Sequence, residues 1–220
     1  MHFLTFDTSL DKTYLTLFYE KNAIDTEIIE THDDKYHSAY LIQNLVNLLK
    51  RHNLTVKNIE AIGVNIGPGS FTGIRACLTI ARVIAQQLEI PLVGVPSTEI
   101  LAQINKNKNK TIVLMDARKG MCYFAEYDNN GEEIQEPHLE PIETLSIPDE
   151  STIISDKVMQ NFLKEQEINS ICFSDINEDL GVLLGSLTYK KLQKGSYHWA
   201  KVKPLYLQKP SITISKKNLI

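Results

Sequence analysis

The sequence FLTFDTSLDKTYLTLFY, residues 3–19, contains two apolar runs joined by a short polar link. Runs of this length with a polar turn between them are typical of a β-hairpin. The pattern returns in the second half of the chain, where an apolar run at Thr111–Met115 ends in Asp116 and a second run spans Cys122–Tyr127. A recurring strand–Asp–turn–strand pattern indicates a duplicated fold.

The residues around the first hairpin extend this pattern into an α/β layer. We predict a third strand over Ala23–Thr31, followed by a helix whose apolar side chains recur every three or four residues and which stops near Asn53. A strand at Ile59–Ile66, a helix ending near Glu89, a strand at Pro91–Val95 and a helix from Thr98 complete the first half.

A polar run at 105–110 then separates the two halves, so we expect α/β subdomains at 1–105 and 106–220, each with a mixed sheet. In the second half we predict a strand near Glu132–Glu136 and helices over Val158–Gln166 and Leu180–Lys194. Residues 137–157 cannot be placed, because three prolines interrupt any regular pattern.

Composition limits the classes of function. The chain has 220 residues, 43% hydrophobic, and a formal net charge of −4, which is ordinary for a globular protein and not for a disordered one. No apolar run approaches the ~20 residues of a membrane span, and Met1–Asp7 lacks the basic lead of a signal peptide. Three scattered cysteines and six histidines form no metal-binding motif. We therefore expect a cytoplasmic protein without a metal or cofactor.

The charge is unevenly distributed. Ser186–Ile220 contains eight lysines and no acidic residue, so this tail carries +8 and the preceding residues carry −12. Such asymmetry suggests contact with nucleic acid or an acidic partner. A solvated lysine-rich segment is the simpler interpretation, because the lysines are not clustered.

Two stretches can carry chemistry. Asp7-Thr8-Ser9 lies in the first turn, where an acid and two hydroxyls can hold magnesium or phosphate in a cleft, although the same residues favour turns by local hydrogen bonding. Gly67–Gly73 joins a strand to a helix and can bind an anion through its amides. It lacks the GK[ST] ending of a P-loop, and a tight turn that needs glycine explains it equally well.

The stretch Gly67-Pro68-Gly69-Ser70-Phe71-Thr72-Gly73-Ile74-Arg75 closely resembles the signature GPGSFTG[IL]R of the bacterial TsaB (YeaZ) family. Asp7-Thr8-Ser9, Asp116-Ala117-Arg118 and Pro204–Leu207 resemble further family motifs in the same order. One departure is Gln208, where the family usually has arginine.

This resemblance implies the duplicated actin/Hsp70/sugar-kinase fold. It also implies a noncatalytic role in forming N6-threonylcarbamoyladenosine in tRNA, at the adenosine beside the anticodon. The expected partners are a TsaD-like catalytic paralogue and a TsaE-like ATPase, with tRNA reached through the complex. Without its partner, the chain is expected to form a homodimer.

The resemblance further implies that helices of the first subdomain form the interface with the partner. The expected interface residues are His37, Leu41, Leu45, Gly69, Phe71, Thr72, Arg75, Ala76, Thr79 and Arg82, and Asp7-Thr8-Ser9 is expected to be a vestigial cleft turn. A tryptophan at Ala76 or at Ala81 should block pairing without unfolding the chain.

Two other functions remain open. A stand-alone ATP-dependent phosphotransferase of the same fold would need a glycine-rich adenosine loop in the second half, and the five glycines there form no GG or GxG pair. A homodimeric scaffold without any tRNA role is the other alternative, and copurification with a TsaD-like protein would exclude it.

Overall fold

The computed structural model describes residues 1–30, 37–106, 109–148 and 150–208, without the side chains of residues 37–39. The first sheet has the order β3-β2-β1-β4-β5, in which β1 pairs antiparallel with β2 and parallel with β4. Its strands are β1 His2–Asp7, β2 Thr13–Tyr19, β3 Asn22–Ile29, β4 Ala61–Asn65 and β5 Leu92–Val95.

The second sheet repeats this topology. Its order is β8-β7-β6-β9-β10, and β6 pairs antiparallel with β7 and parallel with β9. The strands are β6 Thr111–Asp116, β7 Met121–Tyr127, β8 Glu133–Pro141, β9 Thr152–Ser155 and β10 Ile171–Cys172. The predicted class is therefore confirmed: the chain is an α/β protein with two mixed sheets in the duplicated actin/Hsp70/sugar-kinase-like arrangement.

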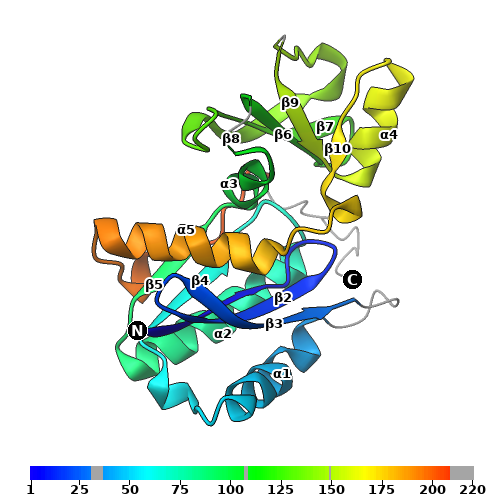
Figure 1. The fold of residues 1–220 in the computed structure, drawn as a ribbon. Helices are drawn as coiled ribbons and strands as arrows, with labels where there is room; N and C mark the ends of the chain where they lie inside the picture. The colour runs from blue at the N-terminus through cyan, green and yellow to red at the C-terminus, as the bar shows by residue number, and fades with distance from the viewer. Residues whose placement is uncertain (31–36, 107–108, 149, 209–220) are drawn as a thin grey trace, which may run out of the picture.

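Helices cover the sheets unevenly (Figure 1). In the first half, α1 and α2 lie on one face of the first sheet and α5 lies on the opposite face. The helix bounds are α1 His37–Arg51, α2 Phe71–Leu88, α3 Ser97–Ala102, α4 Lys157–Glu165 and α5 Leu180–Lys194. Short 3-10 turns occur at Val56–Asn58, Gln103–Asn105, Ile142–Thr144, Phe173–Asp175 and Trp199–Lys201. No helix among the described residues is long and apolar enough to cross a membrane.

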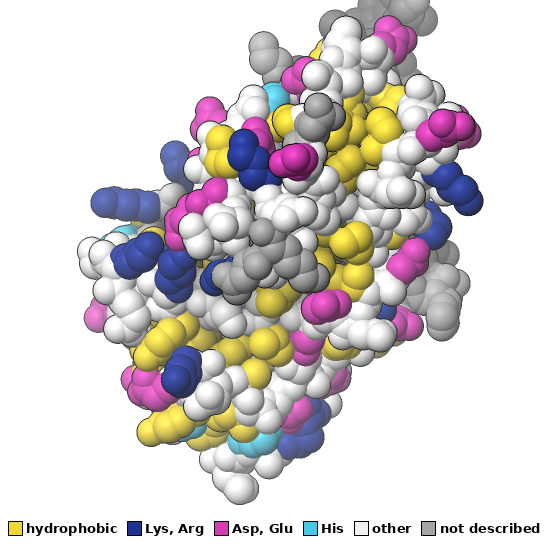
Figure 2. Space-filling view, turned by 45° about the horizontal axis from the view of Figure 1, so that its top comes forward, with side chains coloured by type: hydrophobic (Ala, Val, Ile, Leu, Met, Phe, Trp, Pro, Cys, Tyr) yellow, Lys and Arg dark blue, Asp and Glu magenta, His cyan; other side chains and the backbone are white. Residues whose placement is uncertain are grey.

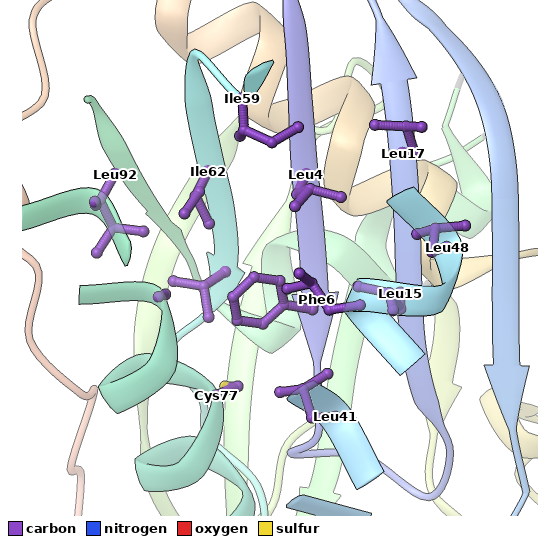
Figure 3. Close-up of a cluster of buried hydrophobic side chains, with 14 of the residues drawn as sticks. Leu4, Phe6, Leu15, Leu17, Leu41, Leu48, Ile59, Ile62, Cys77 and Leu92 are labelled. Carbon is purple, nitrogen blue, oxygen red and sulfur yellow. The ribbon is translucent and has the colours of Figure 1, made fainter. Parts of the chain in front are cut away.

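One hydrophobic core lies between the first sheet and α1 and α2 (Figure 3). Alternate residues of β1, such as Leu4 and Phe6, point to this face because successive strand side chains alternate between faces. They meet Leu41 and Leu48 of α1 and Cys77 of α2, all of which are fully buried. This packing fixes both helices against the sheet.

Two helices link the halves. Helix α5 follows the second sheet in the chain but contacts strands of the first, and α3 follows the first sheet but contacts β6 and β7 of the second. Lys191 of α5 pairs with Glu99 of α3 at 2.9 Å, and Lys190 pairs with Glu132 in the turn after β7. The two halves therefore share a continuous apolar and ionic contact.

Strand β8 corrects one prediction. The third strand of the second half was expected near Glu132–Glu136, but it continues to Pro141 through Pro137. Proline is tolerated here because β8 is an edge strand, where one side of the backbone needs no ladder partner. Part of the region that could not be placed from sequence is therefore regular strand.

Candidate partner-binding surface on α1 and α2

The turn after β1 is closed by internal hydrogen bonds. Asp7 Oδ1 accepts from the backbone N–H of Ser9 at 2.7 Å and from its hydroxyl at 2.6 Å, and Asp7 Oδ2 accepts from Asn65 Nδ2 at 2.9 Å. Asn65 Oδ1 in turn accepts from the backbone N–H of Gly67 at 2.8 Å. The turn therefore holds the loop that follows β4.

The glycines of this loop allow its backbone to pack closely against neighbouring segments. A Cβ at Gly73 would lie 1.8 Å from the carbonyl oxygen of Thr8. The side-chain hydroxyl of Thr8 donates a hydrogen bond to the Gly73 carbonyl at 2.7 Å. Gly67 has φ +97, a conformation that L side chains rarely adopt. Ser70 caps α2 by accepting from the N–H of Gly73 at 3.2 Å. The loop sets where α2 begins and how it lies on the sheet.

This arrangement favours a structural role for Asp7-Thr8-Ser9. All three residues are buried, and the loop N–H groups of Gly67, Ser70 and Gly73 have partners within the chain. Burial raises the pKa of Asp7, against the opposing effect of the hydrogen bonds from Ser9 and Asn65. No group of three or more His, Cys, Asp or Glu among the described residues could hold a metal ion.

The structure separates the expected interface residues into two groups. Leu41 and Leu45 are buried in the core against the first sheet, so their side chains do not reach the surface. Ala81 is fully buried as well, and the expectation that a tryptophan there would leave the chain folded is therefore wrong. The side chain of His37 lies outside the described residues.

The remaining residues line the outer side of the Gly67–Gly73 loop and α2. Four are exposed and three are partly exposed. In chain order they are Gly69, Phe71, Thr72, Arg75, Ala76, Thr79 and Arg82.

Sequence reasoning missed the largest exposed apolar side chains. Tyr40 and Ile42 of α1 are 59% and 58% exposed, and Val83 of α2 is 62% exposed. Val46, one turn after Ile42, is exposed too. The broad apolar stripe of α1 was the available signal, but its outer edge was not distinguished from its buried centre.

An aromatic and cationic cluster marks the start of α2. The Arg75 guanidinium lies 4.0 Å from the centre of the Phe71 ring, and its Nε donates to Tyr206 Oη at 3.0 Å. The rings of Phe71 and Tyr206 are 5.3 Å apart, and both side chains are about half exposed. The late Pro204–Leu207 motif thus contributes to the same surface as the glycine-rich signature.

The charged side chains carried by α1 and α2 have one sign. Neither α1 nor α2 contains an acidic residue, whereas Lys50, Arg51, Arg75 and Arg82 lie on them. Arg51 is paired with Asp25 at 3.0 Å and with Glu27 at 3.3 Å. Arg82 forms no ion pair with any side chain that the structure describes. Apolar side chains beside unpaired cations favour a partner whose surface is apolar with an acidic rim.

Exposed apolar groups also occur elsewhere. Figure 2 shows one face of the molecule, on which hydrophobic side chains form patches in both its upper and lower parts. Val158 of α4, for example, is 57% exposed. Apolar exposure alone therefore does not select α1 and α2. They are distinguished by three features together: the apolar groups, the Phe71–Arg75–Tyr206 cluster and the lack of acidic residues within the two helices.

Comparison with known proteins identifies relatives of this chain. The family model described as "TsaD: tRNA N6-adenosine threonylcarbamoyltransferase" matches residues 28–184. The protein named tRNA threonylcarbamoyladenosine biosynthesis protein TsaB in Bacillus subtilis is 31% identical over 169 residues, covering 76% of this chain and 68% of that protein. The chain belongs to the TsaB (YeaZ) family.

Other members agree with this assignment. The TsaB protein of Buchnera aphidicola subsp. Schizaphis graminum is 32% identical over 130 residues, covering 58% of this chain and 60% of that protein. The solved structure of YeaZ from Pseudomonas aeruginosa superposes with a TM-score of 0.76 at 20% identity, covering 94% of this chain and 99% of that one. The TsaB fold therefore extends over nearly all of this chain.

Proposed function

We propose that this chain is the noncatalytic subunit of an assembly that forms N6-threonylcarbamoyladenosine in tRNA. The family membership and the names of the relatives support a part in tRNA threonylcarbamoyladenosine biosynthesis. The observation that carries the noncatalytic role is the turn at Asp7, whose carboxylate oxygens are occupied by Ser9 and Asn65.

The α1 and α2 surface is the proposed contact with a TsaD-like catalytic paralogue, which a TsaE-like ATPase joins. Two helices from each subunit pack as a four-helix bundle, with Ile42, Val46 and Val83 of this chain on the buried side. Arg75 and Arg82 then face carboxylates of the partner. Phe71 and Tyr206 supply the aromatic anchors that dominate the energy of many interfaces.

Without the partner, the same surface pairs with a second copy of this chain. The homodimer brings Arg75 and Arg82 of both copies together, and like charges weaken it. Salt screens that repulsion, so the homodimer tightens as salt rises, whereas the pair with an acidic partner weakens. Sedimentation at two salt concentrations distinguishes the two pairings.

The test is reconstitution from purified components. Unmodified tRNA is incubated with ATP, threonine, bicarbonate, the enzyme that makes the threonylcarbamoyl adenylate, and the TsaD-like and TsaE-like proteins, with and without this chain. Mass spectrometry of the tRNA nucleosides measures the product. We expect product only when this chain is present. Equal product without it would refute the proposal.

The noncatalytic role has its own test. We expect no ATP turnover by the purified chain alone. Magnesium-dependent hydrolysis that Asp7→Ala abolishes would instead support a phosphotransferase of the same fold. The variant Asp11→Ala, at an exposed position in the same turn, is the matched control.

A further inference from the structure

A cavity of about 570 Å³ lies where α2 ends and β5 begins. Gln86, Glu89 and Pro91 form one side of it, and the segment Tyr197–Trp199 forms the other. Its volume is within the range of small-ligand sites, roughly 300–1,000 Å³. Gln86 is 15 residues after Phe71, about 22 Å along the helix axis, so the cavity is remote from the Phe71–Arg75–Tyr206 cluster.

Three consecutive aromatic residues form the wall. The rings of His198 and Trp199 are 5.1 Å apart with an angle of 31° between their planes. His198 Nδ1 accepts from the backbone N–H of Ala200 at 3.1 Å, so the neutral ring carries its proton on Nε2. Trp199 is partly buried against the core beneath α2. The wall is therefore ordered before any ligand arrives, which reduces the entropy cost of binding.

Unpaired cations follow this wall in the chain. Lys201 and Lys203 are exposed and form no ion pair with any residue that the structure describes. Lys190 and Lys191, by contrast, are paired with Glu132 and Glu99. Two lysines of the tail therefore stabilise the fold, and only the other tail lysines remain candidates for binding a partner or RNA. Lys209, Lys216 and Lys217 lie outside the described residues.

We propose that this cavity binds an unpaired nucleotide of RNA. The base stacks on the aromatic wall, which accepts any base because every base has a π-face. The Glu89 carboxylate accepts a hydrogen bond from an amino or imino N–H at the edge of the base, and the Gln86 amide can donate or accept beside it. Lys201 and Lys203 bind the flanking phosphates.

An apolar peptide is the competing occupant, and the charges favour RNA. The described part of the tail carries lysines and no carboxylate. The lysines attract a phosphate backbone, whereas an apolar peptide offers them no opposite charge. The inference rests on the proposed function, which identifies tRNA as the source of the RNA. It extends that function by giving this chain a direct contact with tRNA.

Trp199 is the only tryptophan in the chain, so its fluorescence reports on this cavity alone. The isolated full-length chain is titrated with purified tRNA and, separately, with a single-stranded RNA oligonucleotide. We expect saturable quenching by both. Two phosphate contacts give a slope of about −1.4 in log affinity against log salt, so affinity should fall about sevenfold between 50 and 200 mM salt.

Variants assign the effect to named groups. His198→Ala removes part of the stacking wall at an exposed position and should weaken binding about tenfold. The double variant Lys201→Gln and Lys203→Gln should remove most of the salt dependence. The matched control is Lys57→Gln with Lys164→Gln, which neutralises two exposed lysines away from the cavity and should bind like the unmodified chain.

Three results would overturn the inference: absence of quenching, equal weakening in the lysine control, or unchanged affinity in His198→Ala. In a separate titration, quenching by the TsaD-like protein and not by RNA would assign the cavity to a protein segment. The RNA titrations themselves contain no partner protein. A negative result here therefore does not affect the proposal that tRNA modification requires this chain. The reconstitution experiment tests that requirement separately.

Discussion

Replacing Gly73 by alanine tests whether the signature loop needs glycine for the close packing of two backbone segments. The new Cβ would lie 1.8 Å from the backbone carbonyl oxygen of Thr8. Real Cβ atoms essentially never lie closer than 3.0 Å to such an atom, so two backbone segments must separate by at least about 1.2 Å. Overpacking of this kind costs about 1–3 kcal/mol. Loss of the hydrogen bond from Thr8 to the Gly73 carbonyl adds about 1 kcal/mol. We expect a loss of about 2–4 kcal/mol in the free energy of unfolding.

The assay is urea unfolding followed by circular dichroism, with Gly195→Ala as the control. Gly195 follows α5 in an extended conformation, and a Cβ there meets nothing within 4 Å. The control should change the free energy of unfolding by less than about 0.5 kcal/mol. If Gly73→Ala is as stable as Gly195→Ala, the close approach does not constrain the loop and the geometric account of the signature is wrong.

Three further predictions concern the core, the buried acid and the thiols. Leu41→Ala should lower the free energy of unfolding, measured in urea, by about 2–5 kcal/mol. Ile42→Ala should lower it by less than about 0.5 kcal/mol and weaken partner binding. Equal losses would show that the buried and exposed sides of α1 are assigned wrongly. Burial raises the pKa of Asp7, so between pH 3.8 and the raised value the native state holds a proton that the unfolded chain has lost, and stability should fall as pH rises through that window. Asp7→Asn should lack this fall when unfolding is measured at successive pH values, and a parallel pH profile would contradict the assignment. Burial also raises the pKa of Cys77 to about 12, so this thiol should not react with a disulfide reagent at pH 8 until urea unfolds the chain, and rapid modification of Cys77 in the native state would contradict its burial.

Much of the fold could be predicted because its signals are local. The hairpin at residues 3–19 and its repeat at residues 111–127 depend on alternation and a short polar turn, and the paired strands follow them closely. Ser70 caps α2, and serine is among the residues preferred at that position. Helix α5 spans Leu180–Lys194 as predicted.

The candidate surface could be predicted only in part. Apolar periodicity in α1 locates a stripe, but a broad stripe does not show which edge meets the sheet, so Leu41 was placed at the interface and Ile42 was not. Contacts between distant residues left no local signal. Tyr206 meets Arg75 across 131 residues of chain, and α5 packs on the sheet of the other half.

The most direct test of the central claim is the affinity of this chain for the proposed TsaD-like partner after one exposed valine is changed to aspartate. Val83 of α2 is 62% exposed and Val158 of α4 is 57% exposed, so the two substitutions are matched in residue type and exposure. Calorimetric titration measures binding after circular dichroism has shown that both variants are folded. The account predicts that Val83→Asp weakens binding at least about tenfold, because a charge would be buried between helices, and that Val158→Asp binds like the unmodified chain. Unchanged binding by Val83→Asp, or an equal loss in both variants, would contradict it.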